Sequence, residues 1–264
     1  MRRLLLALFF ASCTPPVPPS APDALDANVK WFWVNEDSAS DETLISAAQK
    51  LAIAGKADTR TTPFKGQHRE RLTTEELAPV GLQMNDPSKA RGLLVVNLFD
   101  CTLEKLTSIL SDPAQTTLYP GVWANNVRTL ESDRQAFLDG TEATAKWTAD
   151  ISISFPIGDT YTSVVKGTMR RVKAHDFPSD ILLTRVWLTA PAAFAANSTS
   201  FFNQNYEVHI YWEQSPGRVL HAVGAWREVK IGAIDKTLED DDFFTANLNE
   251  LVDWDAKTAS LCAR

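Results

Sequence analysis

The 264-residue chain has few of the residues from which common catalytic and metal centres are built. It contains three cysteines and four histidines, and no two histidines share the His-x-x-x-His spacing of a helical metal site. It also lacks a Gly-x-Ser-x-Gly nucleophile elbow and a glycine-rich phosphate-binding loop. These absences argue against a metal site, a bound cofactor and the common forms of nucleophilic catalysis, so we assign no catalytic residue.

Positive charge and long apolar segments are also scarce. Lysine and arginine total 26 against 33 aspartates and glutamates, which gives a net charge of −7. This balance disfavours nucleic acid as a partner, because phosphate contacts need clustered basic side chains. It equally disfavours electrostatic adhesion to anionic lipid headgroups. After the first residues, no segment is apolar enough to span a bilayer as a helix.

Residues 1–13 have the layout of an export signal. Two arginines precede the short apolar run Leu4–Phe10, an arrangement typical of a secretory signal peptide. The sequence Phe10-Ala11-Ser12-Cys13 resembles a bacterial lipobox, with Phe10 in place of the usual leucine. This resemblance implies cleavage before Cys13 and acylation of Cys13. The alternative is an ordinary signal peptide with an incidental cysteine.

Residues 14–28 are predicted to be a tether. Thr14–Pro22 is proline-rich, which favours extended polyproline geometry of about 3 Å per residue and buries no core. A disordered terminus is the alternative and is compatible with a tether. Thr14 follows the cysteine where aspartate would imply the inner membrane, so the lipobox resemblance implies the outer membrane. We expect a lipid-anchored protein of the bacterial cell envelope, with its domain in the periplasm or at the cell surface.

Residues 29–90 are predicted to be an N-terminal extension with one helix. The aromatic stretch Val29–Val34 is interpreted as a strand or an extended anchor. Ser40 resembles an N-cap and Gly55 a helix stop, so a helix is expected between them. Residues 56–91 are polar and are expected to be rich in loops, with Thr74–Leu77 as a candidate short helix.

The stretch 92–122 is predicted to change from a strand into two short helices. Leu93–Phe99 is a branched apolar run, which is typical of a buried strand. Thr102 is a suitable N-cap for a first helix, which Asp112-Pro113 should end because the residue before proline avoids helical geometry. A second helical turn is expected to run to Leu118.

From Trp123 onward the hydrophobic pattern has period two, which is typical of half-buried strands. Pro156-Ile157-Gly158-Asp159 reads as a turn between two of them. With the run at 93–99, the pattern predicts about seven strands in one antiparallel sheet. The later strands are expected at 123–131, 145–155, 161–172, 181–189, 205–212 and 219–231.

A long helix is predicted to close the chain after Asp240-Asp241-Asp242. The three aspartates are better explained by the helix macrodipole than by a metal site. Asp255 lies on the apolar stripe of this helix, and a buried carboxylate needs a partner. Arg227 or Arg185 would supply one, unless the helix is rotated enough to leave Asp255 in water. The stripe consists of Phe244, Leu248, Leu251, Val252, Asp255, Ala259 and Cys262.

The order of these elements over residues 91–264 resembles the helix-grip fold of the START-like superfamily, which includes polyketide cyclases and plant pathogenesis-related allergens. The segment Asp100–Val122 carries most of the resemblance. The resemblance implies an α+β fold, in which a curved sheet surrounds the C-terminal helix and leaves a hydrophobic cavity with its mouth near Tyr119–Trp123. The expected pocket residues are Trp123, Trp147, Ile151, Tyr206, Ile210, Val223, Phe244, Leu248, Leu251, Val252 and Asp255.

Cys101 and Cys262 remain once Cys13 is acylated. An even pair in an exported protein favours a disulfide. In the helix-grip fold the end of the last helix rests on the two short helices, and Cys101 immediately precedes the first of them. A nucleophilic role for Cys101 is the alternative, but the sequence offers no identifiable base.

Three functions remain open at this point. The leading hypothesis is an exported, lipid-anchored START-like protein that binds a hydrophobic small molecule or lipid in the cavity. The second is a cyclase- or hydratase-like enzyme in the same cavity, where His221 would be an acid or base instead of a structural histidine. The third is a protein-interaction module whose cavity is filled by its own side chains. An open apolar pocket, a pocket lined by titratable groups and a filled pocket distinguish them.

Overall fold

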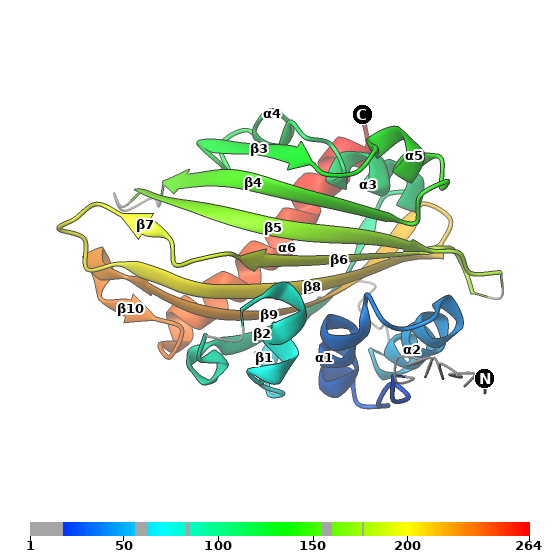
Figure 1. Cartoon of the computed structure of the whole chain (residues 1–264), viewed down its shortest axis with the longest axis horizontal. Helices are drawn as coiled ribbons and strands as arrows, with labels where there is room; N and C mark the ends of the chain where they lie inside the picture. The colour runs from blue at the N-terminus through cyan, green and yellow to red at the C-terminus, as the bar shows by residue number, and fades with distance from the viewer. Residues whose placement is uncertain (1–17, 56–62, 83–84, 155–159, 176) are drawn as a thin grey trace, which may run out of the picture.

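The computed structural model describes residues 18–55, 63–82, 85–154, 160–175 and 177–264 (Figure 1). The export signal, Cys13, the first part of the tether and the turn at 156–159 lie outside the described residues.

One antiparallel sheet dominates the described part of the chain, in the order β1-β2-β9-β8-β6-β5-β4-β3, with β7 beside β5 and β10 beside β9. Its strands are β1 (Phe64–His68), β2 (Arg91–Asp100), β3 (Asn125–Leu130), β4 (Thr144–Ser154), β5 (Thr160–Val172), β6 (Ile181–Leu188), β7 (Ala193–Phe194), β8 (Phe201–Ser215), β9 (Arg218–Ile231) and β10 (Lys236–Thr237). The seven expected strands are present. The total of seven is too low, because β7 and β10 have only two residues each and the five residues of β1 are mostly polar, with no hydrophobic alternation.

Helices occupy both faces of this sheet. The α-helices are α1 (Leu25–Asn35), α2 (Asp41–Ala54), α3 (Leu103–Leu110), α4 (Gln115–Leu118), α5 (Arg134–Leu138) and α6 (Asp241–Cys262). Short 3₁₀ helices lie at Glu75–Val80, Pro87–Lys89 and Gly232–Ile234. The expected caps are confirmed, since Ser40 accepts a hydrogen bond from the Thr43 amide and Thr102 accepts one from the Lys105 amide. The predicted α+β class is confirmed.

The extension differs from its prediction. Val29–Val34 lies inside α1, so the expected strand is wrong and the extension holds two helices. Val29, Phe32 and Trp33 are almost completely buried, because α1 packs against β8, β9 and the neighbouring helix α2. This packing outweighs the strand preference of aromatic and branched residues, which is only a weak tendency.

The helix α1 covers one face of the sheet, across β8 and β9. The Trp33 ring lies 5.8 Å from Tyr206 and 6.1 Å from Trp226, centroid to centroid. Gly224 allows this close approach, since a Cβ atom there would lie only 2.6 Å from a Val29 methyl group. Glu36 lies at the end of α1, and its side chain packs against this same face of the sheet.

Glu36 forms an ion pair with Arg185, which was one of the two partners predicted for Asp255. The Arg185 Nε lies 3.2 Å from a Glu36 carboxylate oxygen, and both side chains are almost completely buried. Burial raises the pKa of Glu36 to about 7, although the Arg185 charge acts in the opposite direction. Arg185 therefore fixes the extension to the sheet and does not reach α6.

The helix α6 covers the other face and crosses behind the strands in Figure 1. Its main contact is with β2. Phe244, Leu248 and Leu251 pack there against Val95 and Val223 in one apolar cluster. The sheet is thus buried on both sides, with α1 and α2 on one face and α6 on the other.

A disulfide joins Cys101 to Cys262, with 5.3 Å between the two Cα atoms. This confirms the predicted bridge. It fastens the end of α6 to the short segment between β2 and α3, and so closes a covalent ring that runs from Cys101 to Cys262.

Candidate functional site

Most of the predicted pocket residues lie on the face of the sheet that α6 covers. Val223, Phe244, Leu248 and Leu251 are buried in one cluster, and Val252 packs at its edge. Trp147 and Ile151 lie in a neighbouring cluster with the leucines of α3. The structure brings these side chains together by packing them directly against one another.

Tyr206 and Ile210 lie on the opposite face, so their prediction as partners of α6 is wrong. Both belong to the cluster that contains Trp33 of α1. The apolar side of β8, to which both residues belong, faces α1. The polar side, with Glu207, His209 and Tyr211, faces α6. The sequence pattern separates the two sides of a strand, but it does not say which side each helix covers.

Aromatic rings close the expected mouth of the cavity. The Tyr119 ring is stacked on Trp254 of α6, with 4.1 Å between centroids and 19° between planes. Trp123 lies against both, at 5.6 Å from Tyr119 and 4.9 Å from Trp254. Trp254 was not predicted, because it falls beside the apolar stripe of α6 and not on it.

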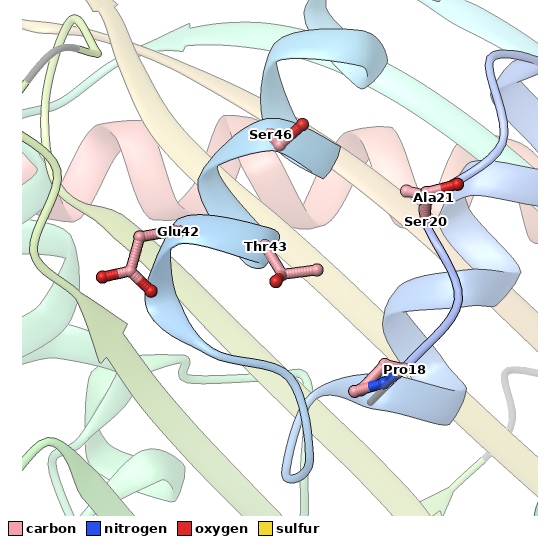
Figure 2. Close-up of a pocket in the computed structure, with 6 residues that line it drawn as sticks. All are labelled: Pro18, Ser20, Ala21, Glu42, Thr43 and Ser46. Carbon is pink, nitrogen blue, oxygen red and sulfur yellow. The ribbon is translucent and has the colours of Figure 1, made fainter. Parts of the chain in front are cut away.

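Two hollows on the described residues are lined by elements other than α6. The first has a volume of about 340 Å³ and lies between α2 and the segment before α1, bordered by Pro18, Ala21 and Thr43 (Figure 2). The second, of about 290 Å³, lies beside β4 and β5 near Asp150 and Thr189. Within the part of the chain that the structure describes, neither hollow provides the cavity expected between α6 and the sheet.

A hydrogen-bonded chain of polar side chains lies between α6 and the sheet. Asp255 of α6 is 1% exposed. One of its oxygens accepts a 2.9 Å hydrogen bond from Asn97, and the other lies 2.9 Å from Nδ1 of His221. Neither Arg227 nor Arg185 contacts it, so both proposed partners are wrong, as is the alternative of an exposed Asp255.

From Asp255 the chain of polar side chains continues through two histidines. Nε2 of His221 lies 2.9 Å from Nδ1 of His209, and Nε2 of His209 lies 3.3 Å from Glu207. The Tyr211 ring stacks on His221, at 4.1 Å between centroids. These contacts hold His221 as a hydrogen-bonded structural residue between α6 and the sheet.

Arg227 connects the other end of this chain of polar side chains to α6. It donates a 2.7 Å hydrogen bond to Glu207 and a 3.3 Å hydrogen bond to Asn247, and it lies 3.5 Å from Glu250. Burial alone would raise the pKa of Glu207, but Arg227 and His209 together hold it well below its ordinary value. The pKa of Arg227 is raised, because its two carboxylate partners outweigh its burial.

These groups are able to share protons, yet none of the described hollows reaches them. The side chains of Glu207, His209 and Arg227 are only 11–13% exposed. The sequence signal that marks them is the polar side of β8 together with a carboxylate on the apolar stripe of α6. Together, these two features predict a buried polar interface between β8 and α6.

Two further features are absent from the described residues. Groups of three or more histidine, cysteine, aspartate or glutamate side chains placed to hold a metal ion are absent from that part of the chain. Its helices include none that is long and apolar enough to cross a membrane.

No protein-family model and no curated protein matches the chain. Among solved structures, the crystal structure of human STARD10 aligns with 66% of this chain at 7% identity and a TM-score of 0.43. The alignment covers 63% of the STARD10 chain, which is less than two thirds of its length. The observed arrangement itself is a large antiparallel sheet with a long C-terminal helix across one face. This is the α+β arrangement expected from the sequence, an antiparallel sheet with a long closing helix on one face.

Proposed function

We propose that the chain is a lipid-anchored, START-like interaction module of the bacterial cell envelope. The observation that carries this proposal is the set of direct contacts between α6 and the elements it covers. Apolar side chains, the polar chain from Asp255 to Arg227 and the stacked ring of Trp254 pack where a ligand would otherwise bind. The lipobox resemblance at Cys13 supports the anchor and the envelope location.

The two other candidate functions each require a pocket beneath α6. A carrier buries 70–90% or more of a ligand in a preformed cavity of roughly 300–1,000 Å³. An enzyme would need such a cavity to end on titratable groups. In the described residues both hollows are remote from α6 and from His221, so neither function is favoured.

The uncovered end of the sheet is the surface that we assign to a partner. Val127 and Val164 are 56% and 41% exposed. Asp150 pairs with both across neighbouring strands, so the three side chains form one row on β3, β4 and β5. The hollow of about 290 Å³ adjoins this row, so the surface has a concave part beside its exposed apolar side chains.

Site-specific photo-crosslinking tests the assignment. A crosslinking residue at position 127 or 164 should trap a covalent adduct in cells that make the full-length protein. The same residue at position 53, where Ile53 is 72% exposed on α2, should trap none. With the crosslinker at 127, Val164→Asp should remove the adduct. Absence of an adduct at both strand positions would reject the surface.

Native mass spectrometry of the same purified protein tests the filled interior. We expect the mass of the protein without a bound lipid, and no saturable uptake of a fluorescent fatty acid. A lipid that co-purifies with the folded protein would overturn the proposal in favour of a carrier.

The anchor gives a separate prediction. Labelling cells with a palmitate analogue should tag the wild-type protein, and Cys13→Ala should lose both the tag and the membrane fraction. Two acyl chains anchor a protein stably where one gives marginal binding. Because an uncleaved signal is able to hold the variant at the membrane, signal removal should be checked by mass. A cleaved Cys13→Ala protein that stays in the membrane fraction would contradict acylation.

A further inference from the structure

The hollow beside β4 and β5 has one charged group in its lining. Asp150 is the single acidic or basic side chain among the described residues that border it. Asp150 is exposed, and within the part of the chain that the structure describes its carboxylate makes no hydrogen bond or ion pair. The hollow therefore carries a negative charge that no described side chain pairs with.

This carboxylate stands in the middle of the exposed apolar row. Asp150 is directly opposite Val127 on β3 and Val164 on β5, so a valine flanks it on each side. The next residue, Ala149, packs on the other face of the sheet in the cluster that holds the leucines of α3, because successive side chains of a strand alternate. The row of Val127, Asp150 and Val164 therefore lies on the face away from α3.

Two lysines share this side of the sheet with Asp150 and do not pair with it. Lys166 is its diagonal neighbour, since it lies opposite Thr148 on β4. Lys146 lies four positions before Asp150 on the same strand, and so on the same side. Both lysines are exposed, and neither forms an ion pair with Asp150 in the described ranges. The carboxylate is thus open to a cation from outside the chain.

The uncharged polar groups of the hollow are placed as hydrogen-bond acceptors. The Asn125 amide nitrogen donates a 2.8 Å hydrogen bond to the backbone oxygen of Asp150, and the Thr189 hydroxyl donates a 3.0 Å hydrogen bond to that of Val164. Both side chains line the hollow. The amide oxygen and the hydroxyl oxygen keep lone pairs that accept. Lysine and arginine only donate, so they match this lining, whereas a carboxylate only accepts.

We propose that the partner places a lysine or arginine side chain in this hollow, with its positive charge at Asp150 and apolar neighbours against Val127 and Val164. The inference rests on the proposed function, because it gives the chemistry of the partner at the same surface. The net charge of −7 acts in the same direction, since complementary charge steers partners together and like charge separates them.

Methyl NMR of the full-length protein in detergent, with labelled valines, tests this chemistry using defined probes. A capped valine–arginine–valine peptide should shift the methyl signals of Val127 and Val164 until they saturate. The same peptide with citrulline, which has the shape of arginine without its charge, should bind about three- to fivefold more weakly. Added salt should reduce this difference, because it screens an exposed ion pair. Equal affinity for the two peptides, or no shift with either, would overturn the proposal.

Charge variants assign the preference to Asp150. Asp150→Asn should bind the arginine and citrulline peptides equally. Glu142→Gln removes the same charge from an exposed side chain just before β4 and should keep the preference for arginine. Asp150→Lys should reverse the sign, so that a valine–glutamate–valine peptide binds better than the arginine peptide. An Asp150→Asn protein that still prefers arginine contradicts the proposal.

Crosslinking in cells separates this inference from the proposed function. With the crosslinker at position 127, Asp150→Lys should lose the adduct and Glu142→Gln should keep it. An adduct that persists in Asp150→Lys leaves the surface in place and overturns the cationic partner. Absence of an adduct at both strand positions of the wild-type background rejects the surface, and the inference with it.

Discussion

Asp255→Ala is expected to destabilise the protein by about 3–5 kcal/mol, the usual cost of removing one partner from a buried charged pair. Asp255 is 1% exposed and accepts from both His221 and Asn97. Its removal leaves two buried donors without acceptors. Urea denaturation, followed by circular dichroism, measures the change in the free energy of unfolding.

Asp253 provides the matched control on the same helix, because it is exposed. Asp253→Ala should change the free energy of unfolding by no more than about 0.5 kcal/mol. Asp255→Asn, which keeps one acceptor oxygen, should fall between the two. An Asp255→Ala protein as stable as Asp253→Ala would show that the carboxylate contributes nothing to the fold.

Reduction of the disulfide is expected to have the second large effect. Cys101 and Cys262 are 161 residues apart in sequence, and the chain-entropy model gives about 5 kcal/mol for a loop of that length. Measured losses for native disulfides are about 2–5 kcal/mol, and we expect a value in that range. The double variant Cys101→Ser/Cys262→Ser should match the reduced wild type in urea denaturation. Coincident unfolding curves for oxidised and reduced protein would contradict the prediction.

Elements with a long, regular pattern were predictable from the sequence. The alternation in β4 and β8 and the capped leucines of α3 each follow from a local rule that the final structure obeys. The disulfide was predictable because only two cysteines remained for the domain. Neighbouring residues determine the strands and the capped helix, so the rest of the chain does not need to be known for them.

The assignment of faces was not predictable in this way. Tyr206 and Ile210 form the more apolar side of β8, which suggested contact with the closing helix. The N-terminal helices compete for the same side, and Trp33 occupies it. What remains for α6 is the side with Glu207 and His209, so the polar residues of the strand became buried.

The content of the space under α6 also depends on long-range packing. A stripe on a helix shows that the helix is buried, but it does not give the distance between helix and sheet. Here Trp254 stacks on Tyr119, and Asp255 meets His221. Both contacts join residues far apart in the sequence, and both come from the same turn of α6.

The disulfide described above also decides how the molecule responds to a mechanical pull. A force applied between the N-terminal segment and Arg264 passes from Cys101 to Cys262 through the covalent bond. Only the chain before Cys101 is then free to lengthen, by roughly 300 Å when fully extended. The helices α1 and α2 and the strands β1 and β2 would unravel under load. The tension would bypass the elements from α3 to α6, so this N-terminal layer alone would lengthen under load.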